Sequence, residues 1–154
     1  MNLKYLFAAV ALFMVAGCES ASRFRMENKA RTAADSFATY FFNWQFDKAA
    51  HFATDSSMIW LRYAASQVHE ADIDLLRVKE DAVINIDEIF INDENTASAR
   101  ITVRDFIRMD TIGTEGHIVE KASFVLQMER NAEKKEDWKI RMEGLPQSEK
   151  RNRD

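Results

Sequence analysis

The C-terminal half of the chain alternates apolar and polar residues with a period of two, and this pattern constrains the fold more than any other feature. A period of two places successive side chains on opposite faces, so each such segment is typical of a strand with one buried face. Four segments of this kind follow one another, at 82–91, 96–109, 117–130 and 137–143. Short polar or glycine-containing connections join them, which predicts an antiparallel four-stranded meander.

The alternation also predicts which side chains form the core. The expected core face carries Ala97, Ala99, Ile101, Val103, Ile107 and Met109, then Ile118, Ala122, Phe124, Leu126 and Met128, and finally Trp138, Ile140 and Met142. The first strand is mixed, because apolar residues occupy both of its faces: Val83, Ile89 and Ile91 on one, and Ile84, Ile86 and Phe90 on the other. Two apolar faces indicate either an additional covered surface, such as a dimer contact, or a β-bulge.

The residues before the sheet have helical periodicity. Apolar residues recur every three or four positions from 27 to 44 and end in aromatic side chains, which predicts an amphipathic helix. A second short helix is expected at 48–53 with Asp47 as its cap, and a third is expected from 58 to 77. Helices followed by strands predict an α+β fold, in which N-terminal helices pack on a curved four-stranded antiparallel sheet.

The first residues of the chain have the three parts of an export signal. Lys4 supplies a positive start, residues 5–15 are all apolar, and Ala16 and Gly17 are small enough for a peptidase pocket. The apolar run is shorter than the roughly 20 residues that a transmembrane helix needs.

The segment Val15-Ala16-Gly17-Cys18 resembles the lipobox of bacterial lipoproteins. The resemblance implies that the Cys18 thiol receives a diacylglyceryl group, that cleavage occurs just before it, and that the new amino terminus is acylated. Membrane lipid is then a partner of the protein through Cys18, because several acyl chains hold a domain on a membrane almost permanently. Cys18 is therefore interpreted as a lipidation site and not as a catalytic residue. The alternatives are an ordinary secretory signal with an incidental cysteine, or a membrane helix.

These features divide the chain into four expected parts. They are a lipoprotein signal peptide at 1–17, a lipidated polar tether at 18–26, an α+β domain at 27–145 and a disordered tail at 146–154. Since Cys18 is the sole cysteine, disulfides and cysteine-based metal sites are excluded. The formal net charge of −4 comes from well-mixed charges without a basic stripe, which argues against nucleic-acid binding.

The order of elements resembles the nuclear-transport-factor-two-like, or cystatin-like, superfamily of cone-shaped α+β domains. The matching features are the helix ending in aromatics, the short segment "FDKAAHFA", a further helix, and long strands that close on "EDWKIRME". The resemblance covers nearly all of residues 27–143. It implies membership of a group that includes lipid-anchored envelope proteins, dimeric transport adaptors and small-molecule enzymes, and a shared fold does not choose among these.

Two acids interrupt the expected core face, Asp105 on the second strand and Glu120 on the third. If the hairpin folds about residues 112–113, Ile107 opposes Ile118 and Asp105 opposes Glu120. Two carboxylates that close in an apolar site cannot both ionise cheaply, so the pair is a candidate catalytic acid and base. The alternatives are that both acids lie beyond the helix cover in water, or that a bulge turns them outward.

The aromatic residues Phe41, Trp44, Trp60 and Trp138 are candidates for lining a hydrophobic pocket, although filling the core is their default role. His69 and Asp72 are three residues apart on an expected helix and could meet at a metal ion. No third ligand has a distinctive spacing, so a solvated helix face is favoured there and no metal or cofactor is expected. His51 is expected to be packed or hydrogen-bonded, and His117 to be exposed.

The sequence thus favours a lipid-anchored cell-envelope protein that acts as a small binding or interaction module. The alternative is an enzyme that acts on a small apolar molecule through Asp105 and Glu120, and a non-enzymatic role is favoured over it. The expected partners are a small apolar ligand, a second copy of the chain or another envelope protein. The periplasmic side of the envelope is the expected location. Glu19 is not the aspartate that commonly retains such lipoproteins at the inner membrane, which favours the outer membrane.

Overall fold

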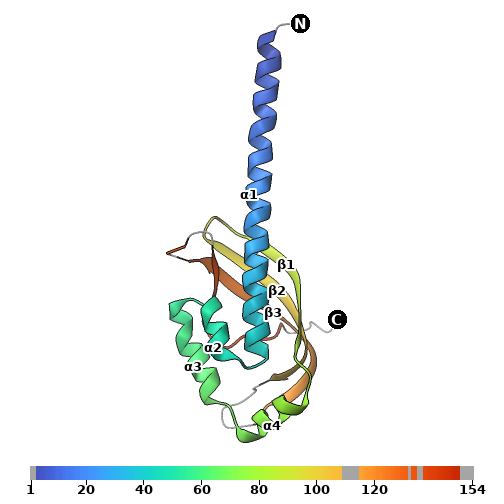
Figure 1. Cartoon of the computed structure of the whole chain (residues 1–154), viewed down its shortest axis with the longest axis vertical. Helices are drawn as coiled ribbons and strands as arrows, with labels where there is room; N and C mark the ends of the chain where they lie inside the picture. The colour runs from blue at the N-terminus through green and yellow to red at the C-terminus, as the bar shows by residue number, and fades with distance from the viewer. Residues whose placement is uncertain (1–2, 109–114, 132, 135–136, 150–154) are drawn as a thin grey trace.

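The computed structural model describes residues 3–108, 115–131, 133–134 and 137–149, and for residues 3–18 it describes the backbone alone. A long helix, α1 (Leu3–Phe42), enters the domain from one end and lies along the concave side of a sheet (Figure 1). Short helical segments follow it: α2 (Phe46–Ala49), η1 (Ala50–Phe52), η2 (Asp55–Ser57), α3 (Met58–Ser66) and α4 (Glu70–Val78). The chain then forms β1 (Val83–Ile91), β2 (Thr96–Arg108), β3 (His117–Arg130) and β4 (Trp138–Arg141).

The four strands form one antiparallel sheet in the order β1-β2-β3-β4, so the predicted meander and the α+β class are confirmed. The predicted register of the β2–β3 hairpin is confirmed too, with Ile107 opposite Ile118 and Ile101 opposite Phe124. Apolar alternation was sufficient for this result, because a slip of one residue would turn every core side chain into water.

A β-bulge in β1 accounts for its two apolar faces. The pairing of β1 with β2 shifts by one residue between Ile86 and Glu88. Before the shift, Ile84 and Ile86 pack against the core, and after it Ile89 does. The extra residue at the bulge moves the apolar residues from one phase of the alternation to the other. The bulge interpretation is therefore confirmed, and the bulge explains the pattern of β1 without an additional cover.

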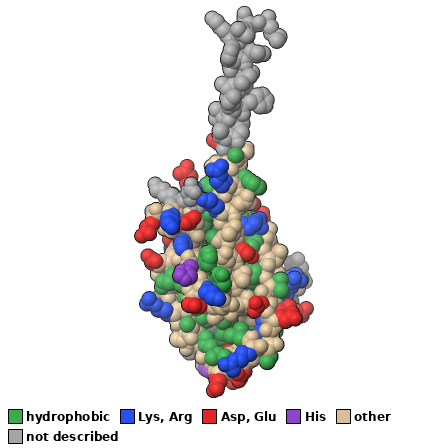
Figure 2. All heavy atoms as spheres, in the orientation of Figure 1, with side chains coloured by type: hydrophobic (Ala, Val, Ile, Leu, Met, Phe, Trp, Pro, Cys, Tyr) green, Lys and Arg blue, Asp and Glu red, His purple; other side chains and the backbone are tan. Residues whose placement is uncertain are grey.

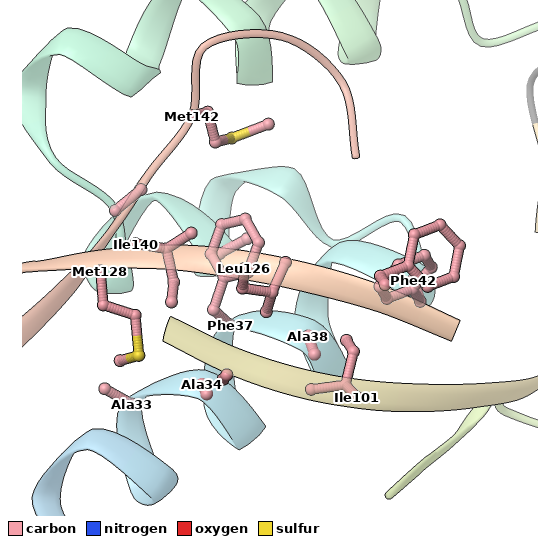
Figure 3. Packing of buried hydrophobic residues seen from close by; sticks show 14 of the residues in the cluster. Ala33, Ala34, Phe37, Ala38, Phe42, Ile101, Leu126, Met128, Ile140 and Met142 are labelled. Carbon is pink, nitrogen blue, oxygen red and sulfur yellow. The ribbon is translucent and has the colours of Figure 1, made fainter. Parts of the chain in front are cut away.

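The core lies between α1 and the sheet. Ala30, Ala34, Phe37 and Ala38 of α1 are all completely buried. Figure 3 shows alanines and Phe37 of α1 facing Ile101, Leu126 and Met128 of the sheet. Small residues on one side of the helix let it approach the sheet closely, and Phe37 fills the space between them. The predicted amphipathic stripe thus faces the sheet as expected.

α1 is longer than the sequence predicted, because the residues expected to form a tether continue the helix. Residues 19–25 are helical and exposed, and the buried stripe begins only at Ala30. Between Gly17 and the end of α1 the chain has no glycine or proline, and Glu, Ala, Arg, Met and Lys are good helix formers. A helix nucleated by the packed segment therefore extends outward at little cost.

The predicted third helix is two helices, α3 and α4, separated at 67–69. His69 has extended backbone angles, and its N–H donates to the Asp72 carboxylate at 2.9 Å. Asp72 thus caps a new helix start at a position where the sequence pattern predicted continuous helix. As a result the chain ends α3 at Ser66 and starts α4 at Glu70.

The end of the chain also differs from the sequence prediction. Ser148 pairs with Phe124, and the N–H of Glu149 donates to the Ser123 carbonyl at 2.8 Å. The first part of the segment expected to be a disordered tail therefore adds to the free edge of β3 beyond β4. Residues 150–154 lie outside the described residues.

Candidate functional site

A cavity of about 150 Å³ lies at the C-terminal end of α1, where this end meets the C-terminal end of β2 and Phe124 in the middle of β3. α1, α2 and the end of β2 supply half of its described lining, and the α1–α2 turn, α3, β3 and residues 145–147 supply the rest. The described lining residues are Phe41, Phe42, Trp44, Phe46, Ala64, Phe106, Ile107, Arg108, Phe124, Leu145, Pro146 and Gln147.

Trp44 closes one edge of this cavity. It has a positive φ of 59°, which turns the chain away from the end of α1. The Gln45 N–H then donates to the Tyr40 carbonyl at 2.8 Å, and this bond helps to satisfy the last carbonyls of the helix. The indole N–H of Trp44 donates to the Ile107 carbonyl at 3.2 Å, so the end of α1 is fastened to the end of β2.

A second positive φ, 53° at Asp105, shapes the wall that the end of β2 forms. It breaks the alternation of β2, so that Phe106 and Ile107 are both buried although they are neighbours in the sequence. Phe106 packs with its ring centroid 5.3 Å from that of Phe42 and 5.7 Å from that of Phe124. This aromatic cluster forms the floor of the cavity and joins it to the core.

The expected acid pair does not lie in an apolar site. Asp105 and Glu120 are both exposed, and neither is among the described residues that line the cavity. The surrounding register is as predicted, with Val103 opposite Ala122. The local change at Asp105 decides the outcome, because the left-handed residue lets Phe106 take the inward position. Local backbone irregularity thus turns Asp105 outward, as one alternative held. Glu120 lies two residues from Ile118, which was expected on the core face but is 50% exposed, so the alternative that this end of the hairpin lies in water applies to Glu120.

The chemistry of the cavity suits binding better than acid–base catalysis. Among its described lining residues, Arg108 alone is charged, and no Asp, Glu, His, Ser, Thr, Tyr or Cys occurs. Such a lining offers aromatic and aliphatic surface, one guanidinium and one amide. Apolar cavities of about 150 Å³ accept molecules of the size of benzene. The arrangement therefore favours a compact group with an aromatic or aliphatic face and a polar edge, because polar atoms as well as apolar ones face the cavity.

Two of the four predicted pocket residues, Phe41 and Trp44, line this cavity. Trp138 does not, because it is buried under the Arg130 guanidinium, which lies 5.4 Å from the ring centroid of Trp138. Trp60 packs partly buried against the core. Sequence reasoning missed Phe106, whose position in the alternation placed it on the outer face.

The histidine and acid pair in "HEADID" has a structural role. Asp72 is 1% exposed, so the expectation of a solvated helix face is wrong for this residue. Its carboxylate accepts the His69 N–H and, at 2.7 Å, the N–H of Gly116 beside β3. Across the residues that the structure describes, no group of three or more His, Cys, Asp or Glu side chains could hold a metal ion.

The other two histidines are exposed. His117 lies at the start of β3, as the sequence predicted. The expectation that His51 is packed or hydrogen-bonded through its ring is not met, since only its backbone carbonyl is engaged, by the Lys139 ammonium. The 3₁₀ conformation of η1 turns this residue outward from the register expected for a longer α-helix.

Cys18 lies within α1, and the structure describes its backbone but not its side chain. Within the described part of the molecule, no helix combines the length and the apolarity that crossing a bilayer requires.

Comparison with known proteins places the fold. No protein-family model and no curated protein matches the sequence. The structure is similar to the crystal structure of a ketosteroid isomerase-like protein from Erwinia carotovora atroseptica SCRI1043, with a TM-score of 0.50 and 14% sequence identity. The similarity covers 75% of this chain and 91% of that chain. It supports the predicted nuclear-transport-factor-two-like architecture, and at this identity it shows the fold alone.

Proposed function

We propose that this protein is a lipid-anchored cell-envelope protein whose cone-shaped domain binds a small apolar molecule. The cavity at the end of α1 carries the proposal of binding. Its described lining is rich in aromatic residues and contains no carboxylate or imidazole that could transfer a proton. The enzymatic alternative is not favoured, because Asp105 and Glu120 are exposed away from this cavity.

The lipobox resemblance of Val15-Ala16-Gly17-Cys18 supports the membrane anchor. After cleavage, α1 would begin at the acylated Cys18 and continue into the domain. Helix residues rise 1.5 Å each, so Phe42 at the cavity lies about 36 Å from the anchor along α1. The cavity would then open at the end of the domain distant from the membrane, where a ligand arrives from the aqueous compartment.

A cavity-filling substitution tests the binding proposal. Ala64 is completely buried and lines the cavity, and its neighbour Ala65 is exposed on the same helix. Benzene and indole serve as probes in thermal unfolding. A probe at a hundred times its Kd stabilises a protein by about 2.7 kcal/mol. We expect a higher Tm with a probe for the wild type and for Ala65→Met, and no shift for Ala64→Met. A wild type that responds to neither probe contradicts the proposal.

The anchor is tested by labelling with radioactive palmitate in a bacterial host. The wild type is expected to incorporate the label, and Cys18→Ser is expected to lose it while the precursor accumulates. Unlabelled wild-type protein would contradict the anchor.

Membrane choice is tested by density-gradient fractionation. We propose the outer membrane for the wild type, with Glu19→Asp moving the protein to the inner membrane. Wild-type protein found in the inner-membrane fractions would contradict this placement.

A further inference from the structure

A second hollow, separate from the cavity, runs along α1 near the anchored end of the domain. It is an open groove of about 780 Å³ between residues 21–33 in the middle of α1, η1 and the start of β4. Its described lining residues are Ala21, Phe24, Arg25, Asn28, Lys29, Thr32, Ala33, His51, Phe52, Asp137, Trp138 and Lys139. We call this surface the α1 groove.

The floor of the α1 groove is apolar, and Phe24 projects at the end of the groove that is nearer to Cys18. Trp138 and Phe52 lie at its base, packed against the core. Phe24 is 67% exposed, although a phenylalanine on a helix gains about 1.5–3 kcal/mol when it is fully buried. Exposed aromatic surface beside an apolar hollow is typical of a surface that another molecule covers.

The charge of the α1 groove is opposite in sign to that of the whole chain. Arg25, Lys29 and Lys139 contribute three cations to its described lining, and Asp137 contributes the one acid. The full chain has a formal net charge of −4. Figure 2 shows several cationic side chains, with acidic ones among them, around α1 where the helix joins the domain. A local excess of positive charge on an acidic protein indicates an anionic partner.

The opposite flank of α1 has acidic residues instead. The charged residues that line a shallower groove there are Glu19 and, in the β1–β2 turn, Asp93 and Glu94, with Arg23 as the one cation in its described lining, so acids exceed cations. Asp93 accepts hydrogen bonds from the Asn95 and Thr96 N–H groups and from the Thr96 hydroxyl. The two flanks of the same helix segment therefore differ in charge, and an anionic surface would attract the α1 groove and repel the turn.

The position of the groove along α1 connects it with the anchor. Ala21 and Phe24 are three and six residues beyond Cys18, which places them about 5 and 9 Å along the helix. Electrostatic attraction to a charged surface acts within about 10 Å in 0.1 M salt. An acylated Cys18 would therefore hold the near end of the α1 groove, at Phe24 and Arg25, within reach of lipid headgroups at all times, in preference to any freely diffusing partner. Lys29, about 16 Å from Cys18 along the helix, would come within reach when α1 tilts toward the membrane.

We propose that the α1 groove is a membrane-contact surface for anionic phospholipid, with Phe24 at the headgroup boundary and Arg25, Lys29 and Lys139 facing the phosphates. The proposal rests on the lipid anchor of the proposed function. Aromatic and cationic side chains favour this interface, because the ring enters the boundary region and the charge meets phosphate. Contact along the groove would tilt α1 toward the bilayer and turn the Asp93–Glu94 side away from it.

The experiment uses the full lipidated protein reconstituted in vesicles. Once Cys18 is acylated it has no thiol, so a cysteine introduced by Phe24→Cys is the single site for an environment-sensitive fluorophore. Val78→Cys is the matched control, because Val78 is 82% exposed on α4, at the end of the domain opposite the N-terminus (Figure 1). Vesicles of phosphatidylglycerol with phosphatidylethanolamine are compared with vesicles of phosphatidylcholine.

In the anionic vesicles, we expect the label at position 24 to emit at shorter wavelength and to lose its quenching by iodide. The label at position 78 should remain quenched in both lipids. The charge-reversed variant Arg25→Glu with Lys139→Glu should restore quenching at position 24. A label at position 24 that stays quenched in anionic vesicles overturns the proposal, as does equal protection in phosphatidylcholine.

Two further measurements separate this proposal from its premise. Intact mass shows whether the diacylglyceryl group is present, so an unacylated chain would refute the anchor and not only the groove. Protection of position 24 already in detergent, before vesicles are added, would mean that protein covers the α1 groove, and this result also overturns the lipid assignment.

Discussion

The Asp72 carboxylate joins two separate parts of the domain, and its removal is the most informative single perturbation of the fold. It is almost completely buried and accepts two backbone N–H groups, from His69 at 2.9 Å and from Gly116 at 2.7 Å. The first bond starts α4, and the second ties α4 to the residue before β3. We therefore expect Asp72→Ala to loosen both elements at once.

The size of the effect depends on the number of hydrogen bonds lost. A hydrogen bond to a charged group contributes about 1.5–3 kcal/mol, so two give a loss of at least about 3 kcal/mol. Asp72→Asn retains one acceptor oxygen and should lose about half of this. With a urea slope of about 2 kcal/mol/M, Asp72→Ala should unfold at a urea concentration about 1.5 M lower than the wild type.

Gly116 provides an independent test of the same contact. A Cβ at this position would lie 2.4 Å from Cγ2 of Ile107, which is buried, and 3.2 Å from the Asp72 carboxylate. Overpacking of this kind costs about 1–3 kcal/mol. Because Gly116→Ala and Asp72→Ala disturb one contact, the double variant should be less destabilised than the two separate losses added together.

Urea unfolding followed by circular dichroism measures all of these variants. Asp74→Ala is the control, because Asp74 lies on the same helix in an exposed pair with Arg77 at 3.1 Å, and such pairs contribute about 0.5 kcal/mol or less. If the stability of Asp72→Ala lies within about 0.5 kcal/mol of that of Asp74→Ala, the range expected for an exposed pair, the buried Asp72 contact does not exist in solution.

Three further outcomes are expected from the structure. Asp105→Gly should raise the Tm and Asp105→Val should lower it, because a residue with a side chain costs about 1–2 kcal/mol in the left-handed conformation that Asp105 adopts. Equal Tm values for the two variants would contradict the positive φ of Asp105. Phe37→Ala should cost about 3–5 kcal/mol in urea unfolding, whereas the exposed Phe24→Ala should cost less than about 0.5 kcal/mol, and similar losses would mean that α1 is packed differently. The Asn95 N–H, together with the hydroxyl and N–H of Thr96, lowers the pKa of Asp93. The ionised Asp93 carboxylate stabilises the fold fully above the ordinary pKa of aspartate, and this stabilisation is lost as the pH falls through the lowered pKa of Asp93. The Tm difference between the wild type and Asp93→Ala should therefore disappear in acid.

Most of the sheet could be predicted from the sequence, and the candidate site largely could not. The register between Ile101 and Phe124 could be found by matching apolar residues across a hairpin. The cavity depends on Phe106, which the same rule placed outside. Phe106 is inside because burial of a phenylalanine contributes about 1.5–3 kcal/mol and aromatic pairs add to it, which exceeds the roughly 1–2 kcal/mol cost of the left-handed Asp105.

The break between α3 and α4 was missed for a similar reason. A stripe of apolar residues indicates a helix, but it does not report a distant partner such as Gly116, which binds Asp72 from 44 positions away. The continuation of α1 through residues 19–25 had a local signal in its good helix formers, and the polarity of the segment outweighed that signal in the interpretation.

By itself, the sequence determined the α+β class, the bounds of the strands to within one or two residues, their order and pairing, and the apolar side of the first helix. These depend on the periods of two and 3.6 residues, which are properties of the local backbone. Only the tertiary structure decided where β1 bulges, which way Asp105 and Phe106 point, and what lines the cavity and the α1 groove. Those features depend on the packing energy between segments far apart in the chain, and no local period records that energy.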